Sequence, residues 1–330
     1  MSSFHALLVI SFGGPEKKED VLPFLENVLR GKNVPQERML EVAEHYYHFG
    51  GRSPINDQNR ALIAALEQEF ASHGLKLPIY WGNRNWQPLV GDTIRQMHND
   101  GVRHAVALAT SAFGSYSGCR QYRQDIGTAL EEAAAQDLVI EKLDNFCDRP
   151  EFIEVMAERV RSASAQLPDA EQIVFTAHSV PISMAQSSPY VRQLELASEK
   201  VARECGMRQW ALVYQSRSGP PSQPWLEPDI CDYLRAQHAA GVRSVIVCPI
   251  GFISDHMEVL YDLDTEARAL CDELGLRMVR AGTAGPHPLI ASMVREMILQ
   301  CQTTPVMAHC EPGCCPTPQR PAVKPLTTAG

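Results

Sequence analysis

The feature of this sequence that most constrains its fold is a repeated alternation between short β-branched apolar runs and longer helical patterns. Residues 60–72 form one such helical pattern, with Gly74 placed to cap its end. Strict alternation of strands and helices predicts parallel sheets covered by helices on both sides. The runs that we interpret as strands are 7–12, 79–81, 104–109, 138–140, 173–177, 210–214, 244–248 and 276–279.

The predicted strands divide into two sets of four, separated near residues 144–150. We therefore expect an α/β protein with two similar Rossmann-like lobes, each a four-stranded parallel sheet flanked by helices. The expected lobes are residues 1–146 and 147–303, followed by a Cys-containing, Pro-rich tail at 304–330. In such folds a ligand sits at the carboxyl ends of the strands.

Composition excludes several classes of function. The net charge is -9, and no Lys/Arg cluster suitable for nucleic acid is present. No apolar run approaches the roughly 20 residues that cross a bilayer, and the first residues lack the charged region of a signal peptide. We expect a cytoplasmic protein that contacts a membrane peripherally at most.

An acidic run sets Glu258, Asp262 and Glu266 four residues apart on an expected helix, so that the three carboxylates share one face. Like charges at this spacing repel each other, and a cation beside them would relieve the repulsion. The alternative is a solvated acidic face.

Histidine at the end of the fifth predicted strand is the second candidate site. His178 lies in the run 176–181, where a neutral imidazole could accept a proton near neutral pH. The alternative is a structural histidine. His256, two residues before Glu258, is either a second ligand or a polar residue with satisfied hydrogen bonds.

Two aromatic loops, 46–54 and 116–122, suit a flat apolar ligand with polar edges. Arg30 could bind a ligand carboxylate as a fork. Each of these features is also compatible with an ordinary surface loop. The pair Gly13 and Gly14 lacks the spacing of a dinucleotide fingerprint, so nucleotide binding is not favoured.

Taken together, five sequence blocks resemble the ferrochelatase family over residues 6–300. The resemblance implies a chelatase-like fold in which an enzyme inserts Fe(II) into a porphyrin held between two lobes. The blocks are 11–16, 49–56, 176–181, 224–228 and 251–262, in the order that the family has them.

The resemblance also implies roles for the candidate residues. His178 would take the protons of the pyrrole nitrogens, and Glu258 would face it from the opposite side of the macrocycle. Asp262 and Glu266 would continue a carboxylate ladder that relays iron or protons, so all four residues are expected metal ligands. Two protons must leave as a doubly charged ion enters, which requires both a base and an anionic path.

Residues 23–28 and 116–122 resemble the actinobacterial-type branch, which converts coproporphyrin III to coproheme in haem b biosynthesis. Protoporphyrin IX, giving protohaem, is the alternative substrate. Two positions depart from family patterns: Phe12 replaces a frequent Tyr, and Leu29 replaces an Arg found in some members. The expected porphyrin-binding residues are Phe12, Arg30, Tyr46, Ser53 and Tyr122.

Three tail cysteines indicate a further metal centre. Some family members hold a 2Fe-2S cluster with tail cysteines and one cysteine from the body of the protein. Cys147 is the expected fourth ligand, with Cys301 as the alternative. Zinc held with His309, or a redox-active thiol pair, are other interpretations. The tail ligands would be Cys310, Cys314 and Cys315.

Two rival functions remain open from sequence alone. One is a cobalt chelatase acting on an earlier tetrapyrrole, whose metal site usually has more histidine. The other is a non-catalytic haem or metal carrier, which would not need His178 and Glu258 to be opposed. The expected partners are porphyrin and Fe(II), with transient contacts to other enzymes of the haem pathway.

Overall fold

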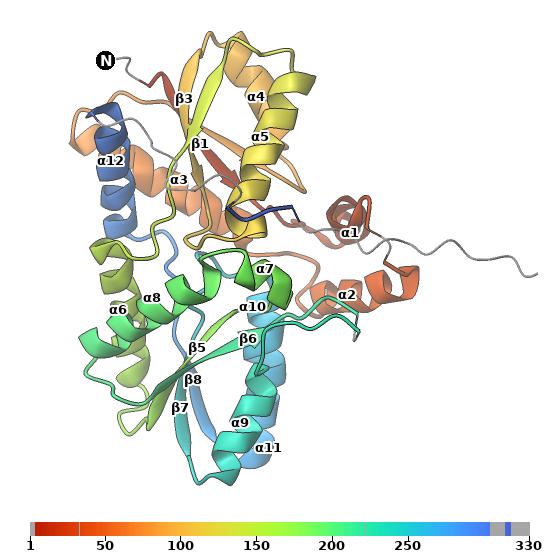
Figure 1. Cartoon of the computed structure of the whole chain (residues 1–330), viewed down its shortest axis with the longest axis vertical. Coiled ribbons are helices and arrows are strands. Elements are labelled where there is room, and N and C mark those ends of the chain that lie inside the picture. Colours follow the sequence, from red (N-terminus) through yellow and green to blue (C-terminus); the bar gives the residue numbers. More distant parts are fainter. Residues whose placement is uncertain (1–3, 33, 221, 304–313, 318–330) are drawn as a thin grey trace, which may run out of the picture.

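The fold consists of two four-stranded parallel sheets, each covered by helices (Figure 1). The computed structural model describes residues 4–32, 34–220, 222–303 and 314–317. The first sheet has the order β2-β1-β3-β4 and the second the order β6-β5-β7-β8. The predicted fold class is therefore confirmed. The strands are β1 (Ala6–Ser11), β2 (Ile79–Asn83), β3 (His104–Ala109), β4 (Val139–Lys142), β5 (Gln172–His178), β6 (Trp210–Gln215), β7 (Ser244–Cys248) and β8 (Arg277–Arg280).

Central strands form where the apolar runs are continuous, because both faces of a parallel sheet are covered by helices. Every residue of β1 and of β7 is buried. Each of the eight strands begins and ends within two residues of its predicted run, and polar residues such as Asn83, His178 and Gln215 are the last residues of their strands.

Helices connect the strands in both lobes. In the first lobe they are α1 (Val21–Leu29), α2 (Gln36–His48), α3 (Ile55–Ser72), α4 (Val90–Asn99) and α5 (Gln121–Glu132). In the second they are α6 (Pro150–Ser164), α7 (Ile182–Gln186), α8 (Tyr190–Glu204), α9 (Ile230–Ala239), α10 (Met257–Val259), α11 (Arg268–Leu274) and α12 (Pro288–Thr303). Helix α3 starts earlier than the predicted pattern, and Gly74 follows it with the positive φ of a capping glycine.

The largest hydrophobic cluster runs through both lobes, and each sheet has a further buried cluster on its other face. The largest cluster includes Leu66 of α3, Val155 of α6 and Val294 of α12. Helix α12 packs against both α3 and α6, and its Arg295 pairs with Glu69 of α3 at 2.8 Å (Figure 1). Because the last helix returns to the first lobe, the division at residues 146 and 147 stays a prediction.

A helical hairpin departs from the simple alternation. Helices α1 and α2 both lie between β1 and α3 in the chain, and they pack on each other through a small separate core. Phe24 of α1 and Ala43 of α2 are buried in this core. The hairpin projects beside the acidic segment of the second lobe (Figure 1).

The acidic run is not an ordinary α-helix. A single turn, α10, passes into a π-helix at Leu260–Ala267, and α11 continues from it. The wide π-helix still places residues four apart near one another, so the expected common face of the acids is retained. Such helices are rare and frequently occur at functional sites.

Candidate active site

The candidate site forms where strands of the second sheet end. His178 is the last residue of β5, and its partner in the parallel register is Gln215, the last residue of β6. The loop after β7 leads to α10, which carries Glu258. Three consecutive segments of one sheet thus bring an imidazole, an amide and a carboxylate to the same edge.

The imidazole of His178 has a fixed orientation. Its Nδ1–H donates to the carbonyl of Ser179, and the hydroxyl of Tyr190 donates to the carbonyl of His178 at 3.0 Å. In the neutral ring the other nitrogen, Nε2, is then the acceptor. It lies 3.6 Å from Oε2 of Glu258. The site therefore presents a basic nitrogen beside a carboxylate.

Each member of this pair favours the charged form of the other. Burial opposes protonation of His178, but the Glu258 carboxylate and the Ser179 carbonyl outweigh burial and raise the pKa of His178 above its ordinary value. Burial also opposes ionisation of Glu258, but His178, His256 and Lys32 outweigh it and lower the pKa of Glu258 to about 2. Glu258 is thus a carboxylate at every physiological pH.

His256 contacts the same glutamate. Its Nδ1 accepts the Glu258 backbone N–H at 3.2 Å and lies 3.8 Å from the carboxylate. Burial lowers the pKa of His256, which keeps this ring neutral. The contact is a helix cap, so the structure supports the interpretation of His256 as a polar residue with satisfied hydrogen bonds.

The expectation that His178 and Glu258 face each other across a macrocycle is wrong. A flat ring between them would need roughly 3.5 Å of contact distance on each face, about 7 Å in all. The observed separation is 3.6 Å. The two side chains instead form one pair that would address a ring from the same side.

Asp262 is held by the residues that end β6. The Ser216 hydroxyl and the Gln215 Nε2 both donate to Oδ2 of Asp262, and Gln215 also donates to the carbonyl of Glu258 at 3.2 Å. Burial, together with Glu258, raises the pKa of Asp262 to about 7, despite these two donors. Partial burial and Asp229 raise the pKa of Glu266. At neutral pH Glu258 is therefore ionised, whereas Asp262 is partly protonated.

The predicted porphyrin-binding residues lie on the first lobe and its hairpin. Phe12 is 37% exposed and lies edge-on to Phe24. Tyr46 on α2 packs against Phe24, with ring centroids 5.7 Å apart, and burial together with the Glu258 carboxylate raises the pKa of the Tyr46 hydroxyl. Arg30 is exposed and donates to Asn27 at 2.5 Å.

Ser53 and Tyr122 are more enclosed. Ser53 is buried, and its N–H donates to the carbonyl of Pro15 at 2.9 Å. A Cβ on Gly14 would lie 2.7 Å from the Cβ of Ser53, so the glycine pair serves close packing here. Tyr122 is buried beneath the guanidinium of Arg84, 5.0 Å from its ring centroid.

Sequence reasoning missed several residues of the site. Lys32, in the connection between α1 and α2, helps to lower the pKa of Glu258, and Arg84 lies over the ring of Phe12 at 5.9 Å. Gln215 and Ser216 were also missed. The rule that found His178, a polar residue closing an apolar strand, would have found Gln215 as well.

The described part of the tail docks against Arg120, at the start of α5, and against Ser187, at the end of α7. Arg120 donates to the carbonyl of Cys314 at 3.0 Å, and the N–H of Cys315 donates to Ser187 at 3.2 Å. The two tail thiols lie 3.4 Å apart. Cys310 and His309 lie outside the described residues, and Cys301 is half-buried on α12.

Cys147 is a core residue. It is buried, and its N–H donates to Ala112 at 3.2 Å. Burial, with a contribution from Asp148, raises the pKa of its thiol to about 12. Across residues 4–32, 34–220, 222–303 and 314–317, no three His, Cys, Asp or Glu side chains converge as a ready metal site.

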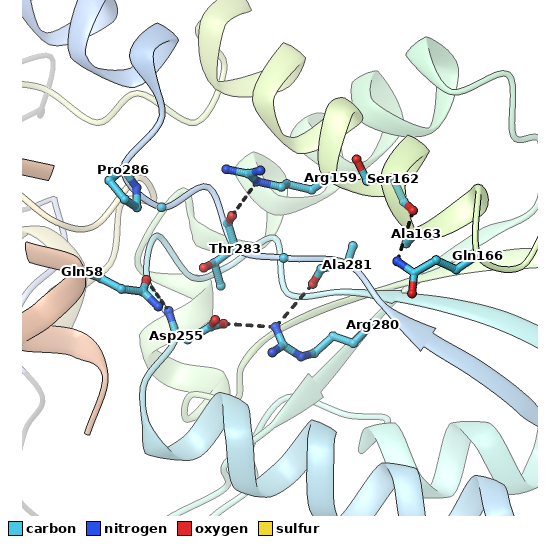
Figure 2. Close-up of a pocket in the computed structure, with 12 residues that line it drawn as sticks. Gln58, Arg159, Ser162, Ala163, Gln166, Asp255, Arg280, Ala281, Thr283 and Pro286 are labelled. Atoms are coloured by element: carbon cyan, nitrogen blue, oxygen red, sulfur yellow. Dashed lines mark hydrogen bonds and ion pairs between the residues drawn. The ribbon is translucent and has the colours of Figure 1, made fainter. Parts of the chain in front are cut away.

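A cavity of about 410 Å³ lies behind the acidic segment, at the contact between the lobes (Figure 2). Gln58 of α3, Asp255 and Arg280 line it, and Gln58 accepts the Asp255 N–H at 3.0 Å. Arg159 on its far side donates to the carbonyls of Thr283 and Ala284. The cavity contains none of the expected proton- or iron-handling residues.

Comparison with known proteins identifies the family. A family model described as ferrochelatase matches residues 5–302. This chain belongs to the ferrochelatase family. It is therefore an enzyme of the class that inserts iron into a porphyrin, and the resemblance of the five sequence blocks is confirmed.

Several relatives match nearly the whole chain of this ferrochelatase. A ferrochelatase of Rhodopirellula baltica is 51% identical, covering 97% of this chain and 96% of the relative. The coproporphyrin III ferrochelatase of Streptomyces coelicolor is 49% identical, with coverage of 96% and 94%. That of Mycolicibacterium smegmatis is also 49% identical, with coverage of 90% and 89%.

Solved structures support the fold. The sirohydrochlorin chelatase SirB from Bacillus subtilis subspecies spizizenii, in complex with cobalt, aligns with a TM-score of 0.57 and 11% identity. The alignment covers 91% of this chain and 96% of SirB. At this identity the likeness shows a shared two-lobed architecture and nothing about the metal or the tetrapyrrole. Among the described helices, none has the length and apolar character needed to span a bilayer.

Proposed function

We propose that this ferrochelatase inserts Fe(II) into coproporphyrin III, giving coproheme. The observation that carries the chemistry is the His178–Glu258 pair, in which a fixed Nε2 lone pair lies 3.6 Å from a carboxylate. The substrate is supported by relatives named coproporphyrin III ferrochelatase that are 44 to 49% identical to this chain.

The proton steps follow from the pair. Iron insertion releases two protons from the pyrrole nitrogens while a doubly charged ion replaces them. His178 accepts one proton at Nε2, and the resulting imidazolium is stabilised by Glu258. Because Glu258 has a pKa of about 2, it stays ionised and can balance either the imidazolium or the entering cation.

The acidic row would serve the second proton and the delivery of iron. Asp262 lies next to Glu258 and has a pKa of about 7, so it exchanges a proton near neutral pH. Glu266 continues the row toward solvent. Oxygen ligands of this kind hold Fe(II) weakly enough for release into the macrocycle.

Recognition of the porphyrin would come from the first lobe. Coproporphyrin III carries four propionates, whereas protoporphyrin IX carries two propionates and two vinyl groups. Cationic and hydroxyl side chains near the hairpin can bind the additional carboxylates. The residues that we assign to this role are Arg30, Tyr46, Ser53 and Tyr122, with Phe12 against the ring.

The test is a side-by-side measurement of Fe(II) insertion into coproporphyrin III and protoporphyrin IX under anaerobic conditions. We expect kcat/KM to be at least about tenfold higher for coproporphyrin III, since unpaired polar groups discriminate by more than 1 kcal/mol. Equal or reversed kcat/KM values would contradict this proposal and would favour protoporphyrin IX as the substrate. Absence of iron insertion with either substrate would favour a porphyrin or metal carrier.

We also propose a 2Fe-2S cluster held by the tail cysteines 310, 314 and 315 and one cysteine of the body. Such a cluster would supply one-electron redox chemistry or would simply fix the tail to the fold. Adjacent thiols at Cys314 and Cys315 suit thiolate ligation. The original candidate for the fourth ligand is Cys147, but the contact between Arg120 and Cys314 supports the neighbouring Cys119.

Two matched variants decide between these cysteines. Protein purified without oxygen should be brown, with stoichiometric iron and acid-labile sulfide. Cys119→Ser should lose this absorbance, whereas Cys147→Ser should keep it if Cys119 is the ligand. The reverse result would restore Cys147. A colourless wild-type protein that binds zinc would indicate a Cys3His site instead.

We further propose a cytoplasmic location, with peripheral membrane contact at most and transient contacts to enzymes that supply or use the porphyrin. The cysteines support this proposal, because Cys248 and Cys271 are buried in the core as free thiols. Free thiols are typical of a reducing compartment. Cell fractionation with a tagged chain would test the location.

A further inference from the structure

Behind the acidic row, the side chain of Arg280 joins two carboxylates. It stands at the end of β8, and its Nε and Nη2 donate to the two carboxylate oxygens of Asp264 at 2.6 and 2.8 Å. Its Nη1 donates to Asp255 at 3.1 Å (Figure 2). The Arg280 side chain is only 15% exposed, so water screens these ion pairs weakly.

The two partners of Arg280 lie on either side of Glu258 in the chain. Asp255 precedes α10, whereas Asp264 lies within the π-helix. Asp264 is two residues from Asp262, about half a turn away, so it points to the opposite side of the helix. The Arg280 guanidinium therefore binds the acidic segment on the side opposite to Asp262, which faces the active site.

The same cluster is connected to the first lobe. The backbone N–H of Asp255 donates to Gln58 of α3 at 3.0 Å (Figure 2). Arg280 also donates to its neighbour Ala281 at 3.4 Å. The start of the acidic segment is thus attached both to the sheet of its own lobe and to a helix of the other.

These contacts offset two energetically unfavourable features of the acidic segment. A π-helix is less favourable than an α-helix, and the carboxylates along its active face repel one another. A rigid guanidinium fork can hold two acids at fixed positions, which a lysine ammonium cannot do in the same geometry. The segment therefore keeps its shape through contacts on the side away from the substrate.

We propose that Arg280 is a positioning residue for iron insertion, holding Glu258 and Asp262 in line by clamping the π-helix through Asp255 and Asp264. The inference rests on the proposed role of these acids in handling iron. Arg280 itself touches no reacting group. Its charge is already matched by two carboxylates, so it is not an anion-binding residue of the cavity in Figure 2.

The test is the kinetics of Arg280→Met with Fe(II) and the porphyrin varied separately. We expect KM for Fe(II) to rise and kcat to fall, giving a loss of about 10- to 100-fold in kcat/KM for iron. The dissociation constant for porphyrin, measured by fluorescence quenching, should stay within about twofold. Arg280→Lys should recover only part of the loss, because the fork is missing.

A matched control lies on the same strand. Arg277 begins β8 and makes an exposed bidentate pair with Asp169 at 3.0 and 2.6 Å, far from the acidic row. Arg277→Met should leave both iron and porphyrin kinetics unchanged. If Arg280→Met does not fold, Asp264→Asn keeps the shape of the partner and should give a smaller loss in the same direction.

The outcomes separate this inference from the proposed function. Wild-type protein that inserts no iron would overturn the function itself. Wild-type activity together with unchanged iron kinetics in a folded Arg280→Met variant would overturn only the clamp. Equal losses for iron and porphyrin would also overturn it, because general disruption of the cleft would then explain the effect.

Discussion

Nε2 of His178, which ends β5, lies 3.6 Å from Oε2 of Glu258 in α10, which follows the neighbouring strand β7. The distance is too long for a hydrogen bond, and the orientation fixed by Ser179 leaves Nε2 as an acceptor. Two acceptors facing each other across a short gap favour whatever positive species enters between them. Protons and metal cations, the two species exchanged in iron insertion, both fit that requirement.

Replacement of His178 should separate catalysis from porphyrin binding. His178→Ala removes the proposed base while leaving the aromatic and cationic residues of the first lobe in place. We expect kcat for Fe(II) insertion to fall by about 10²- to 10⁴-fold, the range for a positioned acid-base group. Fluorescence titration should give a porphyrin dissociation constant within a few-fold of wild type.

His73 provides the control for this experiment. It lies at the exposed end of α3 and contacts only Glu69 among the ion pairs of the described chain. His73→Ala should behave as wild type. If His178→Ala kept full turnover with intact porphyrin binding, the imidazole would have no role as a base.

The pH dependence of kcat/KM should reflect the protonation of His178 beside Glu258. Glu258 raises the pKa of His178, and a base must be unprotonated in the free enzyme. Log kcat/KM should therefore decline as pH falls through the raised pKa of His178. In Glu258→Gln the carboxylate is lost, so that pKa falls and the acidic limb should move to lower pH, with a lower rate overall. An acidic limb that stays in place would show that another group controls it.

Much of this architecture could be predicted because it depends on local pattern. Continuous apolar runs specified the buried strands, and polar residues at their ends, such as His178, marked the edge where a ligand binds. Four-residue spacing placed Glu258, Asp262 and Glu266 on one face. These inferences need only the periodicity of strands and helices.

The remaining features depend on contacts between distant parts of the chain. The π-helix is held by Gln215 of β6 and Arg280 of β8, neither of which is near it in sequence. The close approach of His178 and Glu258 depends on how the end of β5 lies relative to α10, so their placement on one side could not be deduced from spacing. The return of α12 to the first lobe likewise depends on long-range packing.

Ser216 should tune the acid next to Glu258. It adopts a positive φ of 60° and donates its hydroxyl to Asp262, which favours the ionised carboxylate. Ser216→Ala removes this donor, so the pKa of Asp262 should rise above about 7 and more of the acid should be protonated at neutral pH. We expect kcat/KM at pH 7 to fall about fivefold, corresponding to about 1 kcal/mol, and to recover toward pH 8.5.

The measurement for Ser216 is a ratio of rates at the two pH values, which is insensitive to the amount of active protein. Ser72→Ala is a suitable control, because Ser72 donates to Gln68 on the exposed end of α3. Its ratio should equal that of wild type. A Ser216→Ala profile that superimposes on wild type would mean that Asp262 takes no part in the rate-limiting proton transfer.

The hairpin of α1 and α2 should depend on one aromatic contact across the lobes. His45 of α2 stacks on Tyr261 of the π-helix, with ring centroids 3.6 Å apart and planes inclined by 7°. Because the hairpin has its own small core, loss of this stack should loosen it without unfolding the lobes.

Tyr261→Ala should speed amide hydrogen exchange in residues 36–48 and raise KM for porphyrin, since Tyr46 adjoins His45. Tyr261→Phe keeps the ring and should resemble wild type, as stacking contributes about 0.5–1.5 kcal/mol. Equal exchange in both variants would show that the stack does not hold the hairpin.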